Sequence, residues 1–568
     1  MRDQDDPVGV ALFAVLCATA ALAAVVWAGA SLAVLVSGRG SLGAGLADAA
    51  RAAVALPDHL TDPGEAWPPP ASERVPGPWI YWPVTIAAFG AAGAATAAVL
   101  RWRAGRRGVG PVRLRRLGVK GDARYATARD LAPLLVKGPM PGRFILGRVA
   151  GHLVATEDRR LSPSTSRRGR ARQGDRGAVA LIGPSRSGKT TAAIAGILEW
   201  DGPAVLASVK TDLLDATVGW RSRQGEVRVF DPTSCTGRER ASWSPLRDAT
   251  TVAGAQRAAR VLSDTAPGSV EDDAFWTSQC EILLFALLFT AANTPDRSMR
   301  DVVDWVLTQD KPGDLGRGDL EPQLQQLLVH PDPDVVAGAE EAGKALLAIW
   351  QMDERTRSSV YATAQSVIWP WADPGVAASA DGCDIDLDWL RSAPNTLYIC
   401  APIDDQQRLQ SVFGGLLGDL IRQAFAHVNR TGKPLDPPVL VVIDEAGNTP
   451  LRSLPEYAST VAGIGILLVT IWQSKAQLDV AYQRAADTIL TNHLTKVFYT
   501  SASDVSGLEL AARLVGDAYL PMRASSADLR GPGGSTSESA TAIPLAPADV
   551  LRQMLPGDAL LILSLIHI

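Results

Sequence analysis

The feature that most constrains this chain of 568 residues is a glycine-rich segment, residues 183–191, that directly follows an apolar segment, residues 178–182. It reads Gly-Pro-Ser-Arg-Ser-Gly-Lys-Thr-Thr and matches the pattern GxxxxGK[ST]. The apolar segment predicts a short buried strand, and the residues after Thr191 predict a helix. In such a strand–loop–helix unit, backbone N–H groups and the helix N-terminus surround a phosphate group. The segment therefore predicts a nucleotide-binding site.

The residue types in this loop predict a division of labour. Lys189 is expected to reach the β- and γ-phosphate oxygens of ATP, and Thr190 to place its hydroxyl on Mg²⁺. ATP and Mg²⁺ are therefore the predicted cofactors. The predicted nucleotide-binding residues are Gly183, Pro184, Ser185, Arg186, Ser187, Gly188, Lys189, Thr190 and Thr191.

A second apolar segment, residues 438–443, ends in Asp444 and Glu445. Its continuous apolar character is typical of a central parallel strand. Asp444 is expected to hold Mg²⁺, directly or through water, and Glu445 to polarise the attacking water as a catalytic residue. Alone, this pattern could be an ordinary strand end, but its combination with the phosphate loop favours ATP hydrolysis.

A third strand is predicted at residues 464–472, directly before Gln473. A glutamine at the end of the strand beside the Asp444 strand can sense a γ-phosphate, so Gln473 is a third catalytic candidate with Lys189 and Glu445. The alternative is a solvent-facing polar residue at a strand end.

The phosphate loop and Asp444 are far apart in the chain, 261 positions from Gly183 to Asp444. Much of the intervening sequence predicts helices, and a strand is expected again at residues 395–400. The fold class is therefore α/β, with a nucleotide-binding domain over residues 178–249 and 386–562 and an all-helical insertion over residues 250–385. A serine- and glycine-rich segment, residues 524–540, predicts a surface loop.

Two uncharged apolar segments near the N-terminus predict a two-helix membrane anchor over residues 1–107. Residues 8–36 would form a helix roughly 43 Å long, more than the ~30 Å of a hydrocarbon core. The second span is expected at residues 79–100, with an extracytoplasmic loop at 37–78. Arginines follow it at once, so the N-terminus and the following body are predicted to be cytoplasmic, in a multi-pass protein of the cell membrane. A cleaved signal peptide and buried soluble helices are the alternatives.

Charge is unevenly distributed, with net +15 over residues 101–176 although the whole chain has net −5. The juxtamembrane basic segment, residues 108–177, could contact anionic membrane lipids or DNA phosphates. Its position beside a span favours lipids.

The five cysteines are scattered and contain no CxxC pair, which argues against a structural zinc site or a disulfide framework. Lysine is scarce beside arginine, 9 against 46, a bias typical of a GC-rich bacterial genome.

Taken together, these elements resemble the type IV secretion coupling proteins, the TraG/TraD class of conjugative DNA transfer ATPases. The resemblance covers nearly the whole chain and rests on the order of several short motifs rather than on one of them. Further motifs that match the family's pattern are residues 121–128, 141–147, 208–212 (Ser-Val-Lys-Thr-Asp), 229–232, 243–245, 275–276, 444–448 and 473–477.

The resemblance implies a RecA-like P-loop NTPase with an inserted all-α domain, working as a homo-hexamer. It implies as partners a relaxase–DNA complex, single-stranded DNA and type IV secretion channel proteins. The roles of Lys189, Thr190, Asp444, Glu445 and Gln473 carry over from the family's motifs, whereas Lys210 and Asp212 match a motif without a clear role.

The chain departs from the family pattern in two places. Some related ring motors carry a trans-acting arginine between the Asp-Glu strand and the glutamine strand, yet residues 453–474 contain neither Arg nor Lys. Residues 563–568, Leu-Ser-Leu-Ile-His-Ile, are expected to be an artefactual tail on a truncated C-terminus.

Three alternatives to a conjugation ATPase stay open: a double-stranded DNA translocase of the FtsK/HerA type, an ATPase or receptor for protein-only secretion, and a degenerate ATPase that acts as a membrane scaffold. The long helical insertion argues against the first, and intact Lys189, Asp444 and Glu445 argue against the last.

Overall fold

The structure is a computed structural model that describes residues 7–106, 115–116, 119–120, 123–157, 177–208, 210–265, 274–310, 318–448, 451–499, 504–526, 535–563 and 566–567. Much of the predicted basic segment, including residues 158–176, and part of the predicted tail lie outside the described residues. The chain divides into two units, Met1–Arg113 and Leu114–Ile568.

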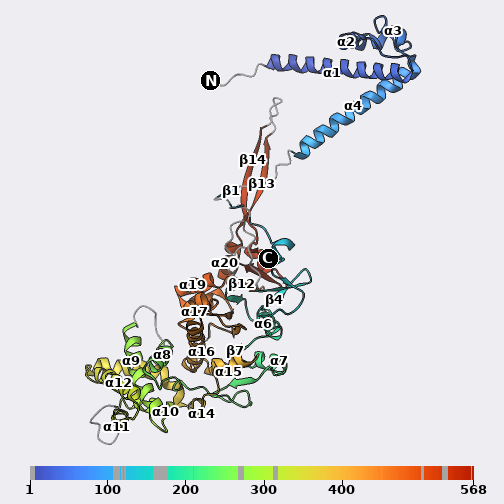
Figure 1. Cartoon of the computed structure of the whole chain (residues 1–568). Helices are drawn as coiled ribbons and strands as arrows, with labels where there is room; N and C mark the ends of the chain where they lie inside the picture. Colours follow the sequence, from blue (N-terminus) through green and yellow to red (C-terminus); the bar gives the residue numbers. More distant parts are fainter. Residues whose placement is uncertain are drawn as a thin grey trace. The chain divides into compact units, whose positions relative to one another are not determined.

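Two long helices form most of the first unit (Figure 1). A Cβ at Gly29 of α1 would lie 2.9 Å from Cγ2 of Thr85 in α4, so the small residue allows the two helices to approach closely. Buried Ala30, Trp67 and Tyr81 form a small core with the segment between them. The elements are α1 (Pro7–Val36), α2 (Leu46–Ala55), η1 (Leu56–Asp58), α3 (Ala71–Arg74) and α4 (Pro78–Arg106).

A nine-stranded sheet organises the second unit, in the order β16-β15-β12-β6-β11-β10-β7-β9-β8. The strands from β12 to β8 are parallel, and β15 and β16 extend the sheet antiparallel. The strands predicted before the phosphate loop, before Asp444 and before Gln473 are β6, β10 and β11, and every residue in them is buried. Continuous apolar runs suit strands covered on both faces. The strands are β6 (Val179–Ile182), β7 (Ala204–Ser208), β8 (Val227–Phe230), β9 (Thr396–Cys400), β10 (Val439–Ile443), β11 (Ile466–Trp472), β12 (Thr495–Tyr499), β15 (Ala559–Leu563) and β16 (Ile566–His567).

Helices cover both faces of this sheet, which confirms the predicted α/β fold class. One face packs against α6 and α7 and against a small antiparallel sheet through Phe144. The other face packs against α16 to α21 in a core that continues into the insertion. The elements are β1 (Arg115–Arg116), β2 (Val119–Lys120), α5 (Ala128–Leu131), β3 (Leu135–Val136), β4 (Ile145–Val149), β5 (His152–Ala155), α6 (Lys189–Leu198), α7 (Asp212–Arg221), η3 (Ile403–Asp405), α16 (Gln410–Thr431), α17 (Leu454–Thr460), α18 (Lys475–Tyr482), α19 (Ala485–Asn492), α20 (Val505–Val515) and α21 (Ala548–Arg552).

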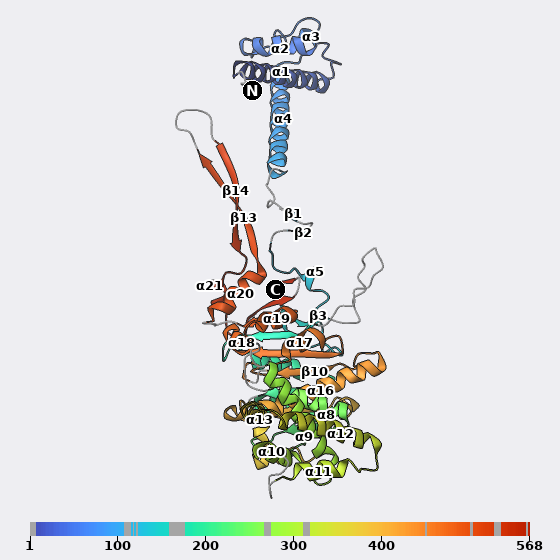
Figure 2. The same ribbon diagram turned by 90° about the vertical axis from the view of Figure 1, so that its left-hand side faces the viewer.

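Between β8 and β9 the chain leaves the sheet as a group of helices, gathered together in Figure 2. Its centre is α9, in which Leu283, Leu287 and Phe289 have no exposed surface. The helices are α8 (Val252–Ser263), α9 (Ala274–Asn293), α10 (Met299–Leu307), α11 (Leu320–Leu327), α12 (Pro333–Trp350), α13 (Glu354–Ile368), η2 (Trp369–Ala372), α14 (Pro374–Ala378) and α15 (Leu387–Ser392).

Length and hydropathy select one candidate membrane span among the described residues, and it is Phe275–Asn293 in α9. That segment is the core of the helical insertion, where 56% of the selected stretch is buried inside the protein, so its apolar character has a structural cause. In the first unit the same test finds Leu22–Val36 only as a shorter apolar helix. The two-helix anchor predicted from the sequence is therefore not confirmed.

The prediction of a surface loop at residues 524–540 is wrong in part. A long antiparallel hairpin occupies this region, with β13 (Asp517–Ser526) and β14 (Ser535–Pro544) paired over ten residues. The serine-rich sequence lacks the apolar alternation that would have indicated strands. At the base of the hairpin, the Ala123 N–H donates to the Asp517 carbonyl at 3.0 Å.

Candidate nucleotide-binding site

The phosphate loop connects β6 to α6 at the C-terminal edge of the sheet. Gly188 (φ 98°) and Arg186 (φ 65°) both adopt left-handed backbone conformations, which glycine tolerates best. A Cβ on Gly183 would lie 2.8 Å from the Cβ of Tyr499, so glycine is also needed where β12 passes the loop. Lys189 and Thr190 then begin α6, whose N-terminus faces the loop.

Lys189 is folded into the loop, where its Nζ donates to the Pro184 carbonyl at 2.6 Å. Only 7% of the residue is exposed. Burial lowers the pKa of the ammonium, although the charges of Asp444 and Glu445 act in the opposite direction. A phosphate oxygen at this position would give the ammonium the anionic partner that a carbonyl cannot provide.

Asp444 follows β10, the strand that lies between β7 and β11. Burial, assisted by the neighbouring charge of Glu445, raises the pKa of the Asp444 carboxyl from 3.8 to about 6, while Lys189 and Lys210 lower it. The Glu445 N–H donates to its Oδ1 at 3.0 Å. A buried carboxylate that resists ionisation gains most from a cation, so the chemistry of Asp444 fits a Mg²⁺ ligand. Thr190, the other predicted ligand, lies in the first turn of α6.

Glu445 adopts a left-handed backbone conformation, φ 51°, which is rare for a residue with a side chain. Strain of this kind clusters at functional sites. One of its carboxylate oxygens, Oε2, accepts from Nδ2 of Asn448 at 2.7 Å.

Gln473 follows β11, which lies between the phosphate-loop strand β6 and the Asp444 strand β10. Trp472 pairs with Ile182 in register, and its carbonyl accepts from the Gly183 N–H at 3.1 Å. The structure thus brings Gln473 to the edge that carries both nucleotide motifs, as the sequence predicts.

Sequence reasoning left three residues near this edge without a role. Lys210 lies close enough to lower the pKa of Asp444, and Asn448 and Gln477 are hydrogen-bonded to each other at 3.0 Å. The motif positions of these residues were visible in the sequence, but their pairing across 29 positions was not.

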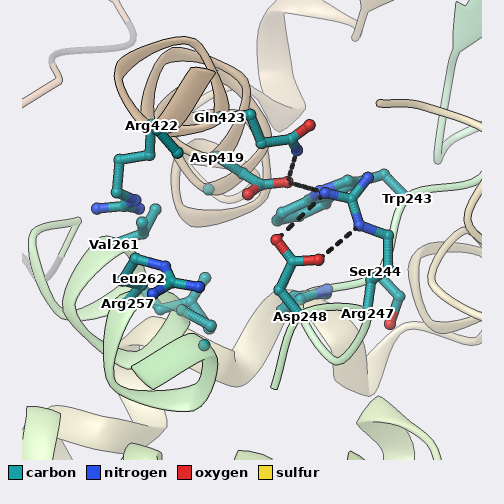
Figure 3. A pocket seen from close by; sticks show the side chains of 15 residues that line it. Trp243, Ser244, Arg247, Asp248, Arg257, Val261, Leu262, Asp419, Arg422 and Gln423 are labelled. Carbon is teal, nitrogen blue, oxygen red and sulfur yellow. Dashed lines mark hydrogen bonds and ion pairs between the residues drawn. The ribbon is translucent and has the colours of Figure 1, made fainter. Parts of the chain in front are cut away.

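A cavity lies elsewhere in the second unit. It is bounded by the loop that precedes α8, by α8 itself and by α16 (Figure 3). On one wall Arg247 is ion-paired with Asp248 at 3.0 Å, and Asp419 accepts from the Trp243 indole at 3.0 Å. On another wall Arg257 and Arg422 lie near each other. None of its lining residues belongs to the phosphate loop or to the strands that precede Asp444 and Gln473, so this cavity is separate from the candidate nucleotide site.

Residues 147–564 match the family model described as Type IV secretory system Conjugative DNA transfer. The chain belongs to this family. The resemblance recognised in the sequence is thereby confirmed over most of the chain.

Two curated relatives, both named conjugal transfer protein TraG from Escherichia coli, are 26% identical over 319 residues and 25% identical over 329 residues. Each alignment covers 53% of this chain and 48% of the relative, so the chain spans about half the length of the curated relatives it matches.

Two solved structures of a plasmid coupling protein share the fold. Unbound bacterial conjugative coupling protein TrwBdeltaN70 has a TM-score of 0.54 and 16% identity, covering 78% of this chain and 91% of that one. Plasmid coupling protein TrwB in complex with ADP and Mg²⁺ has a TM-score of 0.53 and 16% identity, covering 78% and 90%. At such low identity the likeness shows the fold.

Proposed function

We propose that this chain is an ATPase of conjugation that couples a relaxase–DNA substrate to a type IV secretion channel. ATP hydrolysis drives substrate and single-stranded DNA transfer. One observation carries the proposal: in a member of this family, Lys189, Asp444, Glu445 and Gln473 meet at one edge of the sheet.

The proposed chemistry assigns a task to each of these residues. Lys189 and the loop residues 183–191 bind the phosphates, and Thr190 and Asp444 hold Mg²⁺. When bound, Mg²⁺ neutralises the charge that develops on the phosphate oxygens. Glu445 orients and polarises the attacking water, and the Gln473 side chain contacts the γ-phosphate. This is the division of labour of P-loop NTPases, in which positioning and electrostatics supply most of the catalysis.

The proposal includes a membrane anchor and a ring. We propose that α1 and α4 span the cell membrane, with the N-terminus and the second unit in the cytoplasm. The uncharged segments at residues 8–36 and 79–100, and the arginines that begin at Arg101 in the last part of α4, support this topology. Anionic lipids are the proposed partners of the basic segment, and a homo-hexamer is the proposed assembly.

Two alternatives predict different responses to DNA. A protein-only secretion ATPase would hydrolyse ATP without regard to DNA, which suits the acidic composition of residues 177–568, net −16. A double-stranded DNA translocase would respond to duplexes.

The test is ATPase activity of the full chain in detergent, with no DNA, with single strands and with duplexes. Lys189→Ala and Glu445→Gln serve as inactive controls. The proposal expects stimulation by single strands that both substitutions abolish. Hydrolysis that ignores all DNA would replace it with the protein-only alternative, and stimulation by duplexes alone would favour the translocase.

A further inference from the structure

Glu445 is tied to a neighbouring turn by its own carboxylate. The Asn448 N–H donates to the Glu445 carbonyl at 2.8 Å, and the Asn448 side chain turns back so that Nδ2 donates to Oε2 of Glu445 at 2.7 Å. Among the described residues, the structure gives the other oxygen, Oε1, no donor. Asn448 therefore fixes the carboxylate through one oxygen and leaves the second to accept from a water.

The hydrogen bonding of Asn448 continues to the next strand. Its Oδ1 accepts from Nε2 of Gln477 at 3.0 Å, and Oε1 of Gln477 accepts from the Gln473 N–H at 3.0 Å. A backbone N–H can only donate, so the oxygen of Gln477 must face Gln473 and its amide nitrogen must face Asn448. That orientation in turn directs the Asn448 amide nitrogen to Glu445. Each amide orientation follows from the one before it.

The backbone is shaped to allow this path. A Cβ at Gly447 would lie 2.4 Å from Cδ of Gln477, so only glycine lets the glutamine side chain lie across the turn. Gln477 is itself anchored, because its N–H donates to Oγ of Ser474, the N-cap of α18, at 3.0 Å. Gln477 is therefore fixed through its backbone by Ser474 and through its side-chain amide by Gln473 and Asn448.

We propose that Asn448 and Gln477 are positioning residues that link Glu445 to the Gln473 end of β11. This inference rests on the proposed function, because it assigns Glu445 to the attacking water and Gln473 to the γ-phosphate. A shift of Gln473 on the γ-phosphate would move its N–H, and Gln477 and Asn448 would transmit that movement to the Glu445 carboxylate. The orientation of the Glu445 carboxylate thereby depends on whether a γ-phosphate is bound at Gln473.

The test is steady-state ATPase activity of the full chain in detergent, with kcat and KM for ATP measured separately for each variant. Asn448→Ala and Gln477→Ala should lower kcat by about 10- to 100-fold, which is less than the roughly 10²- to 10⁴-fold that general acid–base catalysis supplies when complete, while KM for ATP stays within about twofold. Because both act along one path, the double variant should lose no more than Asn448→Ala alone. Gln256→Ala, on an exposed position of α8, is the matched control and should match the wild type.

Asn448→Asp separates positioning from mere packing. The substituted side chain keeps the size of Asn448 but cannot donate to Oε2 and places a second carboxylate beside Glu445, so kcat should fall at least as far as in Asn448→Ala while KM for ATP stays within about twofold. Gln477→Glu still accepts from the Gln473 N–H but cannot donate to Asn448, so it should resemble Gln477→Ala.

Unchanged kcat in Asn448→Ala and Gln477→Ala, strictly additive losses, or wild-type kcat in Asn448→Asp would each overturn the inference. Melting temperature and binding of a fluorescent ATP analogue identify any variant that misfolds, and Gln477→Glu then replaces it. If the wild type itself failed to hydrolyse ATP, the proposed function would fail, which is a different result from active variants that equal the wild type.

Discussion

The two edges of the central sheet follow opposite designs. At the N-terminal edge, where β7 and β9 begin, the fully buried Arg221 uses all five of its N–H groups, donating to the carbonyls of Trp200, Gly202 and Pro394 and to the side chains of Thr396 and Gln224. Each N–H group of this arginine already has an acceptor within the protein, so none is left to bind a ligand. It binds together the segments that enter the two strands.

At the C-terminal edge the polar groups are incompletely satisfied. Burial raises the pKa of Asp444 to about 6, the Glu445 backbone is left-handed, and the buried Ser187 hydroxyl has no hydrogen-bond partner among the described residues. Unsatisfied buried groups cost free energy unless a ligand completes them. The comparison teaches that one edge stabilises the fold, whereas the other leaves polar groups open, as binding of the proposed nucleotide and cation would require.

The largest effect should come from the ligand edge. Lys189→Ala removes the only ammonium in the phosphate loop, and we expect ATPase activity to fall by at least about 100-fold, as when one electrostatic donor is lost elsewhere. The melting temperature without nucleotide should change little. Lys344→Ala, on an exposed position of α12, is the matched control and should keep full activity.

The second effect should come from the structural edge. Arg221→Ala leaves two buried carbonyls and one partly buried carbonyl without their donor, and we expect the free energy of unfolding to fall by about 3 kcal/mol or more. Thermal unfolding measures this loss, and Arg223→Ala, an exposed arginine two positions away, should show almost none. The molecules that remain folded should keep the wild-type KM for ATP. A raised KM with unchanged stability would break the division between the edges.

The third prediction concerns pH. Because the pKa of Asp444 rises from 3.8 in the unfolded chain to about 6 on folding, its contribution to stability is present below pH 3.8 and is lost as pH rises through about 6. The loss amounts to roughly 3 kcal/mol without ligand. Mg²⁺ needs the carboxylate, so its apparent affinity should fall about tenfold per pH unit below that pKa. Measuring unfolding free energy and Mg²⁺ affinity against pH in Asp444→Asn isolates the contribution of this carboxyl, since that variant should lack both pH dependences.

The smallest expected effect concerns Lys210, which acts on the same carboxyl, Asp444. Lys210 lowers the pKa of Asp444, so Lys210→Ala should move the pH dependence of Mg²⁺ binding upward by less than about one unit. Titration of Mg²⁺ at several pH values measures the shift. A shift in the opposite direction would mean that Lys210 does not act through Asp444.

Local sequence was enough to predict that the candidate site residues directly follow three buried strands, which are β6, β10 and β11. Residues 183–191 carry their loop geometry in their own glycines, and β10 and β11 are continuous apolar runs whose ends place Asp444 and Gln473 at one edge. What local sequence could not predict is pairing at a distance. Asn448 and Gln477 meet only because β10 and β11 are neighbours and α18 turns back over Gly447.

The burial of charged and apolar residues was equally hidden. Nothing near Arg221 in the chain indicates that it will be enclosed by carbonyls from segments almost 200 positions apart. The sequence already placed α9 in the predicted helical insertion, but the enclosure of so apolar a helix by the other insertion helices depends on packing that local sequence does not show.

The most direct test of the two-edge account is the melting temperature of the full chain in detergent, measured with Mg²⁺ and a non-hydrolysable ATP analogue. Saturating ligand should stabilise the wild type by roughly 3 kcal/mol at 100 times Kd, which raises its melting temperature. Arg223→Ala should gain the same rise and Lys189→Ala almost none. No rise in the wild type, or an equal rise in Lys189→Ala, would contradict the claim that the C-terminal edge is the nucleotide site.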